Sequence, residues 1–193
     1  MYSAVERNLL SLSSLGISYS GIPKPEIFIE KKIEEDVNNT IGNSGEKIAV
    51  INISAGDESR IWNNDAWSEV ILFCVKKNYR VVVIAQPNDE SNAQQLVSRN
   101  PQCELFSTPT IQHVVALMRR ATFVVTVDTS VVHIASACNT PIVALYPNVE
   151  WNYRKFHPLS EKQAVVFSGD EKSLKGISTK EAIGKITELI SLL

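Results

Sequence analysis

Short apolar runs recur along most of this chain and alternate with stretches of helical periodicity. The expected strands, most of them rich in Val and Ile, are residues 47–53, 80–85, 103–106, 123–127, 142–146 and 164–167. Helical patterns are expected at residues 65–78, 91–99, 110–120, 130–138 and 179–192. Near-continuous apolar runs are typical of parallel strands that are buried on both faces. The alternation therefore predicts an α/β protein with a Rossmann-like, doubly wound parallel sheet and right-handed crossovers.

The N-terminal part of the chain carries a weaker pattern. Apolar residues at helical spacing, followed by Gly16, predict a short amphipathic helix over residues 3–15. Gly and Pro breakers follow, then a charge run at 30–36 that we interpret as a solvated surface. The expected organisation is an N-terminal helix and a linker that wraps the main domain at residues 1–46, and one Rossmann-like domain at residues 47–193.

Composition narrows the class of protein. The formal net charge is −2, so no basic excess points to nucleic acid as a partner. Cys74, Cys103 and Cys138 lie among apolar residues without the paired spacing of a zinc site or a disulfide framework, which fits reduced core residues. No apolar stretch approaches the length of a membrane span, and the N-terminus lacks the blocks of a signal peptide. We expect a soluble, cytoplasmic protein that binds no nucleic acid.

The turn after the apolar run at 123–127 is the clearest candidate site. Asp128, Thr129 and Ser130 stand where a strand would end and a helix would begin, and His133 follows one helical turn later. A helix N-terminus at this edge of a sheet favours a phosphate through its dipole and its unpaired N–H groups. A capped turn without a ligand would use similar residues, so this pattern alone leaves both interpretations open.

Other polar side chains should share that edge. In a parallel sheet every turn after a strand lies on the same rim, which would bring Ser54, Arg60, Asp89 and Glu90 towards the 128–133 turn. Arg60 could offer a two-pronged contact to phosphate oxygens, and Asp89 or Glu90 could accept hydrogen bonds from ribose hydroxyls. The inventory matches a phosphate site flanked by a ribose site.

Several familiar site types are disfavoured. Neither G-x-G-x-x-G nor G-x-x-x-x-G-K-[ST] occurs, which counts against a conventional dinucleotide site or a P-loop ATPase. There is no G-x-S-x-G elbow, and Ser130 and His133 need not form a nucleophile and base pair. The histidines at 113, 133 and 157 lack metal-ligand spacing, so no metal site is predicted, and we expect His113 to be structural.

A longer motif carries a family resemblance. Residues 128–137 read D-T-S-V-V-H-I-A-S-A and residues 141–147 read P-I-V-A-L-Y-P. They resemble the D-[ST]-G-x-x-H-x-A-x-A and following P-x-V-A-L-F-G-P-T of family 9 glycosyltransferases, the ADP-heptose:lipopolysaccharide heptosyltransferases. The segments 52–56 and 5–17, and the pair of Arg60 and Trp62, also resemble parts of that family, so the resemblance covers nearly the whole chain.

The resemblance implies a GT-B fold, of which this chain would be the C-terminal, donor-binding half. Thr129, Ser130 and His133 would then line the donor diphosphate, and Asp128 would contact the donor. Arg60 would replace the family's phosphate-contacting Lys, Ser54 would stand beside the diphosphate, and Asp89 or Glu90 would stand near the ribose. The donor would be a nucleotide-sugar, expected as an ADP-sugar, and the chemistry would be inverting transfer without a metal or cofactor.

The sequence also departs from the family pattern. Ser130 stands where the family has Gly, and Arg60 stands where it has Lys. The family's N-terminal domain, which supplies the acceptor site and the Asp general base, has no counterpart here, so no catalytic residue is assigned and catalysis by this chain alone is not expected. An N-terminal GT-B half or a partner chain would restore the cleft, and the setting would be lipopolysaccharide or other cell-surface glycan synthesis at the cytoplasmic face of the inner membrane. The alternative is a non-catalytic, degenerate Rossmann-like interaction module that docks a partner through an aromatic loop at 151–157.

Overall fold

A computed structural model describes residues 3–18, 20–21, 25–42 and 45–193. Its centre is a sheet of six parallel strands in the order β3-β2-β1-β4-β5-β6. The strands are β1 (Ile48–Asn52), β2 (Arg80–Ile84), β3 (Cys103–Leu105), β4 (Phe123–Val127), β5 (Ile142–Tyr146) and β6 (Gln163–Phe167). The predicted doubly wound, Rossmann-like sheet is therefore confirmed, including its sixth strand.

The strand order reverses beside β1. This strand pairs with β2 on one side and β4 on the other, so that Val50 lies between Val82 and Val124. The chain runs outward from β1 through β2 and β3 and then returns to β4 on the opposite side of β1. Because all strands are parallel, their carboxyl ends lie along one edge, and open α/β sheets bind ligands at that edge where the order reverses.

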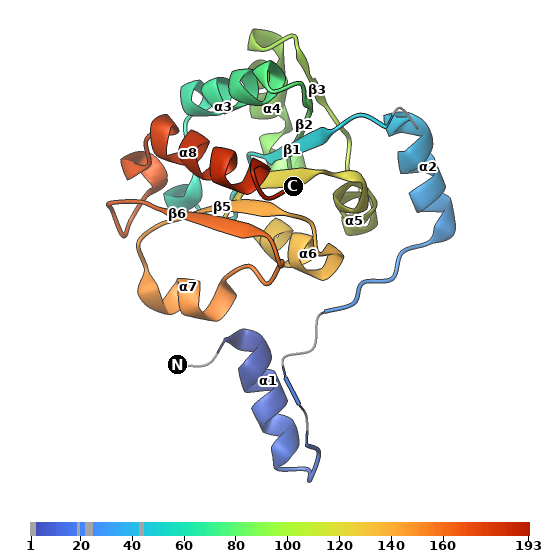
Figure 1. Ribbon diagram of the computed structural model, residues 1–193, viewed down its shortest axis with the longest axis vertical. Coiled ribbons are helices and arrows are strands. Elements are labelled where there is room, and N and C mark those ends of the chain that lie inside the picture. The colour runs from blue at the N-terminus through green and yellow to red at the C-terminus, as the bar shows by residue number, and fades with distance from the viewer. Residues whose placement is uncertain (1–2, 19, 22–24, 43–44) are drawn as a thin grey trace.

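Helices cover both faces of the sheet (Figure 1). The helices of the main domain, apart from α7, are α3 (Asn64–Lys76), α4 (Glu90–Arg99), α5 (Ile111–Arg120), α6 (Ser130–Cys138) and α8 (Thr179–Ile190). Apolar residues of α3, α4 and α8 pack with strand residues such as Ile51 and Val125, and those of α5 and α6 pack with the alternate residues Val50 and Val124. Every residue of β1, β4 and β5 is buried, which explains why these strands read as near-continuous apolar runs.

The three cysteines carry free thiols. Cys74 and Cys103 are buried, and burial raises the pKa of the Cys74 thiol to about 12. A thiol that stays protonated is a poor nucleophile, so these two are inert core residues, as predicted. Cys138, at the end of α6, is only partly buried.

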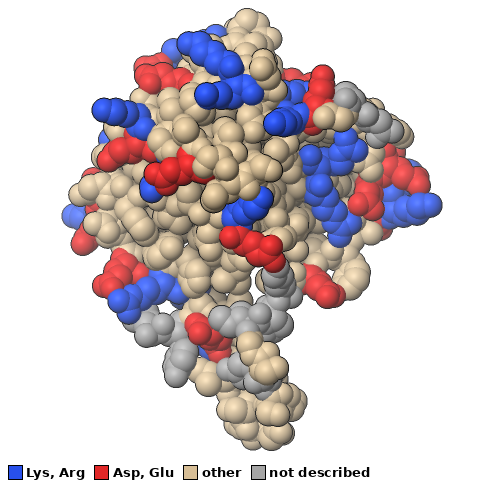
Figure 2. Space-filling view, in the orientation of Figure 1, with Lys and Arg blue, Asp and Glu red and all other residues tan. Residues whose placement is uncertain are grey.

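The expected linker contains a helix that the sequence analysis missed. Helix α2 (Lys31–Ile41) lies beside α5, and its Val37 and Ile41 are 1% and 2% exposed in the core of that face. Ile33, Val37 and Ile41 recur at intervals of four, so the apolar stripe was present but was masked by the charges between its members. Those charges lie on the solvent side, where Figure 2 shows acidic and basic side chains together. The solvated charge run is thus confirmed, whereas the linker interpretation is wrong for this helix; residues 19, 22–24 and 43–44 of the same stretch lie outside the described residues.

The N-terminal helix is confirmed as α1 (Ala4–Ser13), which stands away from the sheet in Figure 1. Ser3 and Glu6 form a reciprocal capping box at its start, and Gly16, at φ +74°, lies just beyond its end. None of its residues is buried. Within the described parts of the chain, no helix combines the length and apolar character that crossing a bilayer requires.

The segment after β5, expected as an aromatic loop, forms the short helix α7 (Glu150–Phe156). The Tyr153 ring packs edge-on against the rings of Tyr146 and Phe167, with centroid distances of 5.4 and 4.8 Å. These partners come from β5 and β6, so tertiary contacts rather than a local apolar pattern hold the helix in place. The expected loop is therefore corrected to a helix.

Candidate functional site

A cleft of about 450 Å³ opens at the carboxyl edge of the sheet, beside the reversal of strand order. The turns after β1, β2, β3 and β4 all contribute to it, as the parallel topology predicts. Its lining includes Asn52, Ser54, Arg60, Gln86, Thr110, Ile111, Thr129 and Ser130. The turns that the sequence analysis assigned to one rim therefore do meet around one space.

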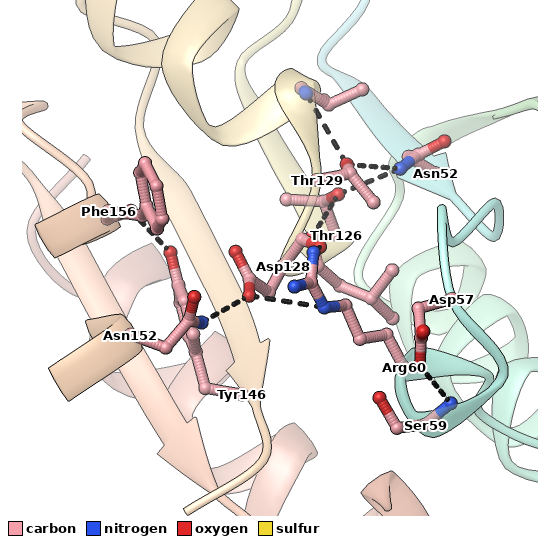
Figure 3. A network of polar contacts seen from close by, with 12 residues as sticks. Asn52, Asp57, Ser59, Arg60, Thr126, Asp128, Thr129, Tyr146, Asn152 and Phe156 are labelled. Carbon is pink, nitrogen blue, oxygen red and sulfur yellow. Dashed lines mark hydrogen bonds and ion pairs between the residues drawn. The ribbon is translucent and has the colours of Figure 1, made fainter. Parts of the chain in front are cut away.

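Asn52 connects two neighbouring strand ends at the cleft through hydrogen bonds (Figure 3). It is the last residue of β1 and only 3% exposed. Its Nδ2 donates to Thr126 Oγ1 at 2.9 Å and to Thr129 Oγ1 at 3.2 Å, which joins β1 to the turn after β4. Asn52 is not among the site residues predicted from the sequence; the available signal was an amide side chain at the end of an otherwise apolar strand.

Two helices begin at the cleft. Thr129 is the N-cap of α6, and its hydroxyl accepts a hydrogen bond from Val131 N at 3.3 Å. Thr110 is the N-cap residue of α5, and both it and Ile111 line the cleft. The positive ends of two helix dipoles therefore border the same space, an arrangement that favours an anion.

Arg60 and Asp128 form an ion pair at the wall of the cleft. Arg60 Nε lies 3.4 Å from Asp128 Oδ2, and Arg60 Nη1 donates to the Asp128 carbonyl oxygen at 3.0 Å. Asp128 is buried and does not line the cleft, and its Oδ2 also accepts a hydrogen bond from Asn152 Nδ2 at 2.6 Å. Figure 3 shows the carboxylate held between Arg60 on one side and Asn152 on the other. The Asp128 side chain therefore supports Arg60, rather than facing the space that a ligand would fill.

The remaining predicted residues are divided between the cleft and its surroundings. Ser54 lines the cleft, and its hydroxyl accepts a hydrogen bond from Gln86 N at 2.8 Å, which links the turns after β1 and β2. Asp89 accepts from Gln86 Nε2 at 2.9 Å but does not line the cleft. Glu90 lines an adjoining hollow of about 390 Å³ that shares Pro87 with the cleft.

His133 lies on the outer side of α6, away from the residues that line the cleft. Its ring packs edge-on against Phe156 of α7 at a centroid distance of 5.9 Å. Desolvation by the surrounding protein lowers the pKa of His133 from its ordinary value, against the opposing charge of Asp128. Folding therefore disfavours the protonated imidazole relative to the unfolded chain.

The protein family to which this chain belongs follows from a match between its sequence and a family model. The family model of glycosyltransferase family 9 (heptosyltransferase) matches residues 1–186. This chain belongs to glycosyltransferase family 9. Similar members include lipooligosaccharide heptosyltransferase 2 of Haemophilus influenzae, 25% identical over 151 residues, and lipopolysaccharide heptosyltransferase 3 of Escherichia coli, 26% identical over 135 residues. Each alignment covers 67% of this chain, but only 43% and 39% of those proteins, so the chain spans less than half the length of these relatives.

Solved structures of family members share the fold. The glycosyl transferase family 9 protein from Veillonella parvula aligns with a TM-score of 0.83 and 18% identity, over 100% of this chain and 61% of that one. The E. coli ADP-heptose lps heptosyltransferase II aligns with a TM-score of 0.75 and 20% identity, over 91% of this chain and 56% of that one. These neighbours are glycosyltransferases of the GT-B type, so the present chain has the Rossmann-like fold of about half of such a molecule.

Proposed function

We propose that this chain is the nucleotide-sugar donor-binding domain of a heptosyltransferase-like glycosyltransferase that acts in lipopolysaccharide or other cell-surface glycan synthesis. The observation that carries the proposal is the cleft at the reversal of strand order, where Arg60 and two helix N-termini meet. A relative is named an ADP-heptose heptosyltransferase, so the donor proposed for this chain is an ADP-sugar.

The diphosphate of the donor is proposed to lie between Arg60 and the start of α6. A guanidinium has five N–H donors, and only Nε and Nη1 of Arg60 contact Asp128. Within the described residues Nη2 has no hydrogen-bond partner, so that edge of the guanidinium can bind phosphate oxygens. Thr129 and Ser130 would add backbone N–H groups and the helix dipole on the opposite side.

The ribose is proposed to reach the adjoining hollow that Glu90 lines. This hollow and the cleft share the wall formed by Ala85, Pro87, Thr108 and Pro109. A carboxylate after the second strand can accept hydrogen bonds from ribose hydroxyls, which is the common arrangement in nucleotide-binding folds of this topology. Asp89, whose carboxylate accepts from Gln86, would hold the turn in shape.

Transfer of the sugar is proposed to need a second half-site. An inverting displacement requires a base within hydrogen-bond reach of the attacking acceptor hydroxyl. Asp128 is committed to Arg60 and Asn152, and the imidazole of His133 faces away from the cleft lining. The acceptor site and the base are therefore proposed to come from an N-terminal half or a partner chain, as the greater length of the relatives suggests.

Calorimetric titration with ADP, ADP-heptose and UDP-sugars tests the donor-binding proposal. We expect binding of the ADP compounds and weaker binding to the Thr129→Ala variant, which loses the hydroxyl shared by Asn52 and α6. The matched control is Asn100→Ala, which removes a buried asparagine bonded to Ser68 and Leu96 and should leave binding unchanged. If no nucleotide or nucleotide-sugar binds the wild-type protein, the proposal is wrong while the fold assignment stands.

A second candidate is the non-catalytic interaction module. Trp151 of α7 is 57% exposed, and exposed aromatic residues next to Arg suit the centre of a protein interface. This candidate predicts no nucleotide binding and loss of a protein partner in a Trp151→Ala variant. Pull-down with wild-type and Trp151→Ala protein, compared with the calorimetry, distinguishes the two functions.

A further inference from the structure

Helix α7 is connected to the wall of the cleft through one side chain, that of Asn152, which contacts Asp128. Asn152 is buried, and its Nδ2 donates to Asp128 Oδ2, the same oxygen that faces Arg60 Nε. The helix is itself fixed to β5 because Tyr146 Oη donates to the Phe156 carbonyl oxygen at 2.9 Å. Burial of the Tyr146 ring raises the pKa of its hydroxyl, which keeps the proton needed for this bond.

Asn152 and Arg60 both contact Oδ2 of the Asp128 carboxylate. A buried carboxylate needs partners for its oxygens, and without Asn152 the side chain could rotate away from Arg60 or draw the guanidinium deeper into the wall. With Asn152 in place, Oδ2 is held at 2.6 Å on one side, and Arg60 rests against it at 3.4 Å on the other. The guanidinium then presents its outer edge to the cleft.

We propose that Asn152 is a positioning residue that sets the orientation of the Arg60 guanidinium through Asp128. The inference rests on the proposed function in one respect, namely that Arg60 binds a phosphate group. It makes α7 part of the phosphate site although α7 does not touch the cleft. Asn152 is separated from Arg60 by 92 residues in sequence, so no local motif connects them.

The test measures ADP binding by calorimetry in a double-mutant cycle. We expect about tenfold weaker binding for Asn152→Ala, the loss typical of one misplaced charge-assisted contact. In an Arg60→Met background the same substitution should cause no further loss, because the group that it positions is absent. Asn100→Ala controls for the general effect of removing a buried asparagine. Unchanged binding in Asn152→Ala, or an equal loss in both backgrounds, would overturn the inference.

A second readout is independent of ligand. The Nε–H resonance of Arg60 in a ¹H–¹⁵N spectrum, assigned by its absence in Arg60→Met, should shift in Asn152→Ala and stay in place in Asn100→Ala. An unmoved resonance refutes the positioning role even if ADP binds. If wild-type protein binds no ADP but the resonance moves, the proposed function fails and the positioning of Arg60 stands. If Asn152→Ala does not fold, Asn152→Leu serves instead; it nearly keeps the side-chain volume and removes the N–H donor to Asp128, so it should also displace the resonance.

Discussion

The ion pair between Arg60 and Asp128 can be tested without any ligand, through the stability of the fold. Two unit charges 3.4 Å apart, as in this pair, attract by about 5 kcal/mol at an effective dielectric constant of about 20. The Arg60 side chain is 32% exposed, so screening by water reduces this to a coupling of about 2 kcal/mol. The hydrogen bond from Nη1 to the Asp128 carbonyl adds about 1 kcal/mol. Arg60→Met should therefore lower the free energy of unfolding by about 3 kcal/mol.

Asp128→Asn removes the charge but introduces an amide whose oxygen can still accept from Asn152. It should therefore lower the free energy of unfolding by about 2 kcal/mol. The double variant should lose only about 3 kcal/mol, because the uncompensated buried carboxylate is gone. Urea unfolding at pH 7, followed by Trp fluorescence, measures all four proteins. A double variant whose loss equals the sum of the two single losses, about 5 kcal/mol, would refute the claim that the side chains interact.

Three further outcomes are expected. Ile41→Ala in α2 should lower the free energy of unfolding by about 3 kcal/mol in urea, because Ile41 is 2% exposed; a loss near zero would mean that α2 is not part of the folded unit. Ser178→Ala should cost about 1 kcal/mol, since Ser178 Oγ accepts from Glu181 N at 3.2 Å in the capping box of α8, and an unchanged melting temperature would contradict this. The pKa of His133 is lowered in the folded protein, so below the ordinary value of 6.5 the unfolded chain binds more protons and stability should fall as the pH drops. The urea midpoint of His133→Asn should therefore depend less on pH between pH 7.5 and pH 5 than that of the wild type. Identical pH profiles of the two proteins would exclude His133 as the source.

The sheet could be predicted from the sequence because its physical cause is local and repeated. The central strands β1, β4 and β5 are apolar runs rich in β-branched residues and are buried on both faces. The five strand-to-strand pairings fit the alternation of strands with helices. Helices α2 and α7 were not predicted, for different reasons. The stripe of α2 was diluted by charges, whereas α7 depends on Tyr153 meeting rings from β5 and β6.

The topology of the sheet was sufficient to predict which turns surround the candidate site. Parallel strands bring their turns to one rim, so Ser54, Arg60, Thr129 and Ser130 were placed around the cleft correctly. The direction in which each side chain points could not be read from its position. Asp128 turns inward because Arg60 and Asn152 contact it from both sides, and these partners are 68 and 24 residues away in sequence.

Helix α1 is capped but packs no buried residue against the sheet, so its amide protons should exchange with solvent faster than those of the sheet. A ten-residue helix is marginal in water, and capping at its ends compensates for only part of the missing tertiary contacts. Since none of its residues is buried, its amide protons reach solvent through local opening, while those of β1 and β4 wait for the whole sheet to unfold. Any partner that covers the apolar side of α1 would therefore register first as slower exchange in this helix, before any change in the sheet.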